Sequence, residues 1–275
     1  MKRLAFIGSV DMQDADVPRI RVASYNVNGV NGRLPRLAEW LRETSPDIVC
    51  LQELKTDDSK FPVKALADEG YGAVWHGQRA FHGVAILAKG ETPAETRRGL
   101  PGDATDVQAR YLEAHAKGVL VASVYLPNGN PVPSRNFDYK LRWFDRFVNY
   151  ARRLHALREP VLVAGDLNVV PTDFDIYNSF WWRFDAVMQA ETREAFQTLL
   201  AQGWTDSVRM LHPTERMYSY WVSEAAYRRG HGFRLDFILA NEAASARIRE
   251  AGIDAEYRVR ARPSDHVPVW VALTA

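Results

Sequence analysis

The stretch VLVAGDLN, residues 161–168, decides the fold of this chain. Its four leading apolar residues predict a strand buried on both faces, which stops at Gly165. Asp166 and Asn168 follow two positions apart, so their side chains should leave the sheet on the same side. A carboxylate and an amide at a strand end suit a metal ion or an activated water. An ordinary turn uses the same residue types, so the stretch indicates chemistry only together with others.

Strands and helices are expected to alternate around this central strand. The apolar patterns predict helices at 34–44, 63–69, 136–157 and 191–202, with Pro35 in the first turn of the first of these. The predicted strands cover residues 19–28, 47–52, 73–76, 84–88, 110–115, 118–126, 217–223, 233–240 and 267–273. This alternation predicts a layered α/β fold.

Polar side chains lie at or beside the ends of the predicted strands. Strand ends of a layered α/β fold can converge on one face, so these side chains form one candidate site. No nucleophilic serine or cysteine motif accompanies them, and their oxygen ligands favour Mg²⁺ or Mn²⁺ over Zn²⁺. The set is Asn26, Glu53, Tyr125, Asp166, Asn168, Asp236, Asp265 and His266.

The composition is that of a globular protein of 275 residues, 47% apolar and 25% charged. We expect one domain over residues 20–275, preceded by an N-terminal arm, residues 1–19, without the cleavage site of a signal peptide. A net charge of +1 means that a nucleic-acid partner would have to meet a local basic face. The single cysteine, Cys50, excludes an internal disulfide, fits a reducing compartment and is expected in the core. No apolar segment is long enough to span a membrane.

Two segments allow more than one interpretation. The helix at 136–157 has an apolar stripe and an opposite face that carries Lys140, Arg142 and Arg146, expected to be solvated for the most part. The segment 171–188, PTDFDIYNSFWWRFDAVM, is long for a loop and rich in aromatic residues. A long irregular segment beside a site is often functional, but packing over the edge of the core explains it equally well.

Six motifs in this order resemble those of the endonuclease/exonuclease/phosphatase superfamily: SYNVNG, LQELK, YLPNG, GDLNVVPTDFDI, RLDFIL and PSDHVPVW. With WHGQ, RRGLPGD and GWTDSVRMLHP they are most similar to exonuclease III and the AP endonucleases, and the resemblance runs from about residue 21 to the C-terminus. It implies a four-layer α/β sandwich, with two face-to-face mixed β-sheets flanked by helices. It also implies a Mg²⁺- or Mn²⁺-dependent DNA repair nuclease that cuts 5′ to abasic sites and acts at the 3′ ends of duplex DNA as exonuclease and phosphatase. The implied protein is a monomer in the cytoplasm, associated with the nucleoid.

The resemblance also assigns roles residue by residue. It matches catalytic residues to Tyr125, Asp166, Asn168, Asp236 and His266, with Asp166 activating water and Asp236 orienting His266. It matches the metal site to Asn26, Glu53, Asp166, Asn168, Asp265 and His266. It matches substrate contacts to Arg97, Arg98, Arg110, Lys140, Tyr220, Trp221, Phe233 and Leu235, and among these Tyr220, Phe233 and Leu235 would line a pocket for a flipped-out abasic sugar.

Two departures from the family pattern leave the preferred substrate open. Residues 219–222 read SYWV where relatives often have Trp-Trp-Asp, and residues 177–188 lack the usual stretch rich in glycine and lysine. One alternative is a phosphatase or phosphodiesterase of the superfamily that acts on a non-DNA substrate, which RRGLPGD and GWTDSVRMLHP argue against. The other is a catalytically inactive DNA-binding relative, which the complete polar set argues against.

Overall fold

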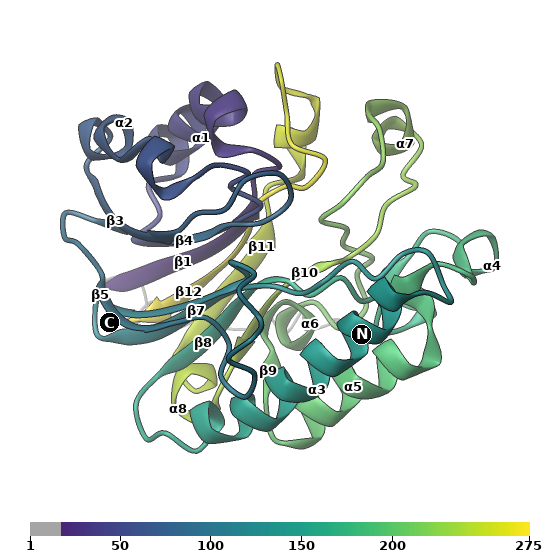
Figure 1. The fold of residues 1–275 in the computed structure, drawn as a ribbon. Coiled ribbons are helices and arrows are strands. Elements are labelled where there is room, and N and C mark those ends of the chain that lie inside the picture. Colours follow the sequence, from purple (N-terminus) through teal and green to yellow (C-terminus); the bar gives the residue numbers. More distant parts are fainter. Residues whose placement is uncertain (1–17) are drawn as a thin grey trace, which may run out of the picture.

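Two six-stranded mixed sheets lie face to face in the computed structural model, which describes residues 18–275 (Figure 1). The first sheet has the order β11 (Ile248–Ile253), β12 (Val269–Thr274), β1 (Arg19–Asn26), β2 (Ile48–Gln52), β4 (Val84–Lys89), β3 (Tyr71–His76). The second has the order β5 (Ala94–Arg98), β6 (Tyr111–Ala116), β7 (Val119–Tyr125), β8 (Val161–Asp166), β10 (Asp236–Ala240), β9 (Thr205–Asp206). Each sheet has a central parallel pair, β1–β2 in one and β7–β8 in the other, and its other pairs are antiparallel.

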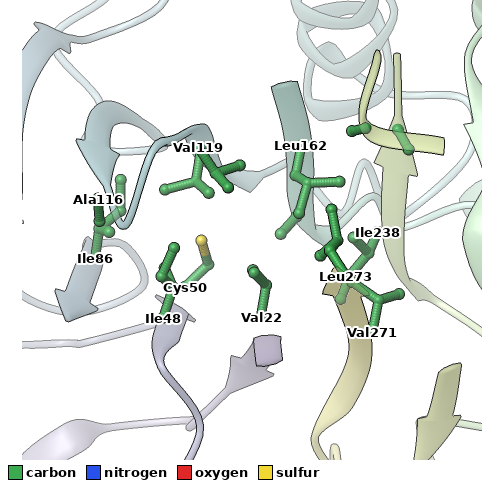
Figure 2. Close-up of a cluster of buried hydrophobic side chains, with 14 of the residues drawn as sticks. Val22, Ile48, Cys50, Ile86, Ala116, Val119, Leu162, Ile238, Val271 and Leu273 are labelled. Carbon is green, nitrogen blue, oxygen red and sulfur yellow. The ribbon is translucent and has the colours of Figure 1, made fainter. Parts of the chain in front are cut away.

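The inner faces of the two sheets form one apolar core. Figure 2 shows side chains of β1, β2 and β4 facing those of β7 and β8, with Cys50 among them. Cys50 is fully buried, and burial raises the pKa of its thiol to about 12, so it acts as a core side chain, as predicted.

Helices cover the two outer faces. Helices α1 (Val30–Thr44) and α2 (Val63–Asp68) lie on the first sheet, and α3 (Arg135–His155) and α5 (Ala190–Ala201) on the second, which completes the predicted four layers. The other helices are short: η1 (Asp58–Lys60), η2 (Asp173–Asp175), α4 (Ser179–Trp182), η3 (Ala186–Met188), α6 (Ser207–Leu211), α7 (Glu224–Arg228), α8 (Glu242–Ser245) and η4 (Ala255–Val259). None of the helices within residues 18–275 is long and apolar enough to cross a membrane.

The first helix begins four residues earlier than predicted. It opens at Val30, so Pro35 lies inside the helix and not in its first turn. The side chain of Val30 is fully buried, and its backbone N–H donates to the carbonyl of Leu54 at 3.0 Å. A tertiary contact therefore sets this helix start, which local sequence preferences could not reveal.

One predicted strand and one predicted strand boundary were wrong in the C-terminal half of the chain. Residues 217–223 do not form a strand, because Tyr220 alone makes bridges, to Phe233 on one side and to His266 on the other. The strand predicted from residue 233 begins only at Asp236, since the N–H of Arg234 turns away to donate to the carbonyl of Asp175.

Gly165 does not end the central strand, which continues to Asp166. A Cβ atom at this position would lie 1.9 Å from the carbonyl oxygen of Val124 on β7. The close approach of two strands, and not a turn, requires the glycine.

The predicted arm, residues 1–19, lies almost entirely outside the described residues. Its last residue, Arg19, already belongs to β1 and pairs with Thr274 of β12.

Candidate active site

The polar strand ends converge on one edge of the sandwich, as predicted. In the second sheet, Tyr125 is the last residue of β7, Asp166 the last of β8 and Asp236 the first of the antiparallel β10. The register places Asp166 directly between Tyr125 and Asp236. The first sheet contributes Asn26, the last residue of β1, and Glu53, which follows β2.

Asn26 connects the carboxylates of the two sheets. Its Nδ2 donates to Glu53 Oε1 at 2.9 Å and to Asp166 Oδ2 at 3.0 Å. Its Oδ1 accepts from the backbone N–H of Asn28 at 3.1 Å. The side chain predicted as a metal ligand therefore points its nitrogen at the acidic groups and orients them, while its oxygen is occupied elsewhere.

Lys55 is a site residue that was not predicted from the sequence. Its Nζ lies 2.8 Å from Glu53 Oε2 and donates to Asn28 Oδ1 at 2.6 Å. Asn28 in turn donates to Asp265 Oδ1 at 2.9 Å. The lysine thus balances part of the negative charge and links Glu53 to Asp265. Its only signal in the sequence was its place in the quoted motif LQELK.

Asp236 and His266 form the predicted pair. Both are buried, and Nδ1 of the imidazole lies 2.8 Å from Asp236 Oδ2. On the other side of the ring, Nε2 lies 3.7 Å from Asp166 Oδ2. Burial opposes the charged imidazole, but the carboxylates of Asp236 and Asp166 outweigh it and raise the pKa of His266. The imidazolium is therefore the stable form at neutral pH, with a proton on each ring nitrogen.

Asp166 is a carboxylate in crowded acidic surroundings. Burial raises its pKa most, the charges of Asp236 and Glu53 add to this, and the His266 cation opposes them. Its Oδ1 accepts from the N–H of Asn168 at 2.9 Å. A buried carboxyl with a raised pKa can accept a proton near neutral pH, which is what a general base requires.

Asn168 is fixed on every side. Its Nδ2 donates to the carbonyl of Leu126 at 2.9 Å, which leaves one amide hydrogen for the site. Its Oδ1 accepts from Asn128 at 3.2 Å, and its backbone carbonyl accepts from Lys140 Nζ at 2.6 Å. Asn168 has a left-handed backbone, φ 44°, and so do Asn28, Glu53 and Lys55. Such strain in non-glycine residues persists only where the surroundings impose it.

Tyr125 is held by Arg110. The guanidinium lies 4.8 Å from the centre of the tyrosine ring, and Nη1 donates to the carbonyl of Tyr125 at 3.2 Å. Burial and then the charges of Glu53 and Asp166 raise the pKa of Tyr125, so its hydroxyl stays protonated and can donate. Arg110, predicted to contact substrate, is itself buried and supports the tyrosine.

A metal ion fits among the carboxylates. Ligand atoms of Glu53, Asp166 and His266 lie within 4.8 Å of one another, and Asp265 lines the same cavity. Burial would raise the pKa of Asp265, but the His266 cation and the amide of Asn28 hold it below its usual value. The oxygens of Glu53, Asp166 and Asp265 suit a hard cation. His266 is less suited, because an imidazolium has no free lone pair for a metal.

The catalytic cavity has a volume of about 150 Å³ and combines this polar edge with an apolar wall. Tyr220, Phe233 and Leu235 all line it, as predicted for these three. Four residues that were not predicted from the sequence also line it: Asn128, Trp182, Asp185 and Val187. Three of these four come from residues 171–188, so this segment does belong to the site.

The other predicted substrate contacts do not line the cavity. Trp221 is buried and points away from the cavity that Tyr220 lines. Its ring lies edge-on to the rings of Tyr218 and Tyr227. Lys140, which the resemblance matched to a substrate contact on a helix face expected to be solvated for the most part, is fully buried. It donates to the carbonyls of Asn128 and Asn168 and supports the floor of the site.

Arg97 and Arg98 lie on β5, the edge strand of the second sheet, and do not line the cavity. Both side chains are well exposed. Arg97 donates to the hydroxyl of Tyr150 at 2.8 Å, and Arg98 is paired with Glu95 at 2.7 Å. A contact with DNA at these positions stays a prediction.

Comparisons with known proteins agree with the fold and with the geometry of the site. Residues 23–266 match the model of the endonuclease/exonuclease/phosphatase family, and the chain belongs to that family. Within it, the chain falls in the exonuclease III and AP endonuclease group. It is 32% identical to an exodeoxyribonuclease III of Haemophilus influenzae over 91% of this chain and 98% of the relative.

Solved structures give the same grouping. An AP endonuclease from Archaeoglobus fulgidus matches with a TM-score of 0.89 and 31% identity, over 93% of this chain and all of that one. A 3′ phosphatase from Neisseria, solved with product DNA hairpin, matches with a TM-score of 0.87 and 37% identity, over 92% of this chain and 98% of that one.

Proposed function

We propose that this protein is a Mg²⁺-dependent DNA repair nuclease that hydrolyses phosphodiesters 5′ to abasic sites and removes nucleotides or phosphates from 3′ ends. The observation that carries the proposal is the row of Asp236, His266 and Asp166, in which His266 and Asp166 line one small cavity together with Glu53. The names of the relatives support DNA as the substrate. We expect the protein to act as a monomer on duplex DNA in the cytoplasm, associated with the nucleoid.

In this proposal each residue has a defined task. Asp166 takes the proton of the attacking water, because its raised pKa makes it a base near neutral pH. The cationic His266, oriented by Asp236, donates to a phosphate oxygen on which negative charge grows. Tyr125 and the remaining amide hydrogen of Asn168 donate to the same group. A divalent cation held by Glu53 and Asp265 would neutralise the phosphodiester charge that repels the nucleophile, and would leave Asp166 free to act as the base.

The size of the cavity supports an abasic site or a 3′ phosphate as the substrate. Its volume of about 150 Å³ is below the range of roughly 300–1,000 Å³ of most small-ligand sites. A phosphate with a bare sugar needs less room than a complete nucleotide. Tyr220, Phe233 and Leu235 offer an apolar wall to such a sugar, and flipping costs least where base pairing is already lost.

The test is incision of a duplex oligonucleotide that contains one abasic site, with Mg²⁺ and with EDTA. We expect cleavage on the 5′ side of the lesion only with metal, and removal of a 3′ phosphate from a nicked duplex under the same conditions. Binding to both DNAs without cleavage in Mg²⁺ or Mn²⁺ would identify an inactive relative. Hydrolysis of inositol or lipid phosphates in place of DNA would contradict the substrate assignment.

A further inference from the structure

A second hollow lies next to the catalytic cavity and has no role in the proposed hydrolysis. We call it the Tyr177 groove, after one of its lining residues, and its volume is about 670 Å³. The residues that matter here are Tyr177, Trp181, Arg216, Tyr218, Arg229 and His231. The groove is thus several times larger than the catalytic cavity, and its size falls within the range of roughly 300–1,000 Å³ of small-ligand sites.

Aromatic faces line the groove. Tyr177 and His231 are stacked, with ring centres 4.3 Å apart and planes 9° from parallel. Trp181 is 71% exposed, which is unusual for so large an apolar side chain. A flat, open aromatic surface of this kind offers stacking to a nucleobase, whatever its identity.

The charge of the groove is positive. Arg216 and Arg229 both line it, and no carboxylate does among the residues that the structure describes. Arg229 is exposed, and its guanidinium has no hydrogen-bond or ion-pair partner within residues 18–275. Arg216 donates to the carbonyl of Ile176 at 2.8 Å and to the hydroxyl of Tyr218 at 3.3 Å, which fixes its position at the groove. Guanidinium groups beside stacking rings suit a ligand that joins a base to a phosphate.

A single wall separates the groove from the catalytic cavity. Trp181 and Trp182 are neighbours on α4, and Trp181 lines the groove while Trp182 lines the cavity. The Nε1 of Trp182 donates to the hydroxyl of Tyr177 at 3.1 Å. Tyr177 also lies edge-on to Phe233, another residue of the cavity, with ring centres 6.1 Å apart. A strand whose phosphate occupies the cavity therefore has the groove within reach of its next nucleotide.

We propose that the Tyr177 groove binds an unpaired nucleotide of the substrate strand, next to the phosphate that is cut. The catalytic cavity is too small for a nucleotide with its base, whereas the groove offers rings for the base and arginines for the phosphate. The protein should then prefer DNA with a single-stranded extension beside the reacting end over DNA that is paired throughout. This inference rests on the proposed nuclease function and specifies its substrate.

The test measures the Kd of labelled DNA by fluorescence anisotropy in EDTA, where no cleavage is expected. The DNAs share one duplex and end blunt, with a short 3′ extension or with a short 5′ extension. We expect either the 3′ or the 5′ extension to lower the Kd by roughly 5-fold or more relative to blunt DNA, because one stacked base contributes about that much. Trp181→Ala and Arg229→Ala should bring the ratio of blunt to extended Kd close to one.

Two matched variants serve as controls. Phe184→Ala removes an exposed aromatic ring from the same segment, and Arg228→Ala removes the arginine next to Arg229, which is paired with Glu224 at 2.6 Å. Neither lines the groove, so both should keep the wild-type ratio. Thermal melting followed by circular dichroism should be unchanged in all four variants, since the four side chains are exposed.

Three results would overturn the inference: equal wild-type affinities for all the DNAs, equal losses on blunt and extended DNA in the groove variants, or loss of the ratio in the controls. Incision of the abasic duplex in Mg²⁺ is scored separately. Incision without any preference for an extension would refute the groove alone. A preserved preference without incision of any DNA would refute the nuclease and leave the groove as a nucleic-acid site.

Discussion

Glu53 is the residue on which metal dependence should rest. Asn26 and Lys55 orient its two oxygens, and neither side chain can replace a carboxylate toward a cation. We expect Glu53→Gln to fold normally and to lose at least about 100-fold in Mg²⁺-dependent incision, since even the outer neighbours of a metal ligand are worth roughly 10–100-fold. Initial rates over a Mg²⁺ titration give the measurement, with exposed Glu194→Gln on α5 as the control. The assignment would be contradicted if the Glu53 variant incised DNA in EDTA as fast as the wild-type protein does in Mg²⁺.

Asp236 and His266 should act as one unit. The carboxylate keeps the imidazole charged and in place, so removing either partner removes the same function. We expect Asp236→Ala and His266→Ala to lower the incision rate by similar factors, and the double variant to lower it little further. Single-turnover rates of the four proteins form the cycle. Losses that add in log rate would mean that the two residues act independently.

The acidic part of the site could be predicted from the sequence, because its residue types lie at the ends of predicted strands. Asp166 and His266 could be predicted only as members of the whole set of polar strand ends, because each of them alone also fits an ordinary turn. Asn128 and Lys55 did not stand out, because asparagine and lysine are common in exposed loops. The burial of Lys140 could not be predicted for a related reason. A lysine opposite an apolar stripe normally faces water, and only the carbonyls of Asn128 and Asn168 explain its burial.

At the scale of elements, the segment 171–188 escaped prediction because its helices are too short to show a period. They are η2, α4 and η3, of three or four residues each. Side-chain caps define them: Thr172 accepts from the N–H of Phe174, Asn178 from that of Phe180, and Asp185 from that of Val187. The capping residues were visible in the sequence, but turns use the same residues.

A buried ion cluster fixes this segment to the second sheet. Asp175 of η2 accepts from Arg234 at 2.8 Å and from Arg209 of α6 at 2.8 Å, and Arg234 also donates to Asp206 at 2.6 Å. Burial would raise the pKa of Asp175. The charge of Arg234 and the hydrogen bonds that Asp175 accepts outweigh burial, so the pKa is lowered. The cluster therefore stabilises the fold while Asp175 is ionised.

Asp175→Asn should lower the free energy of unfolding by about 3 kcal/mol at neutral pH, because it leaves a buried guanidinium partly uncompensated. Since the folded pKa lies below the unfolded value of about 3.9, the stabilisation is complete above that pH and is lost as pH falls through the folded pKa. Urea unfolding of both proteins should show the difference shrinking only at acid pH. The nearby Asp173→Asn removes a largely exposed carboxylate that is paired with Arg193, and it should change stability by less than about 1 kcal/mol. An equal effect of both replacements would contradict the account.

At the scale of the whole molecule, the sequence predicted strands, helices and an α/β class, but the pairing of two sheets came from the resemblance to a family. Strand order and register depend on contacts between distant segments. The strands β5, β9 and β11 were missed altogether. β5 reads AETRR and is exposed along its whole length, so it shows no apolar pattern.

Binding to DNA should depend strongly on salt although the net charge is only +1. Phosphate contacts release counterions, so the logarithm of the affinity falls linearly with the logarithm of the salt concentration. If Arg97 contacts a phosphate, as the resemblance implies, Arg97→Ala should reduce that slope by about one. Anisotropy titrations over a range of KCl give both slopes. An unchanged slope would exclude Arg97 from the DNA path, and a flat wild-type curve would exclude an electrostatic interface.

The left-handed backbone of Asn28 and Asn168 narrows the residues that these two positions can hold. Glycine adopts this conformation without steric strain, but it would remove the hydrogen bonds that Asn28 donates to Asp265 and Asn168 donates to Leu126. In a library randomised at both positions, selection for a folded protein alone should recover asparagine, aspartate and glycine, the residues that tolerate a left-handed backbone. Selection for repair of abasic DNA should recover asparagine alone. Sequencing the survivors of both selections would show how far the active edge restricts the evolution of this protein.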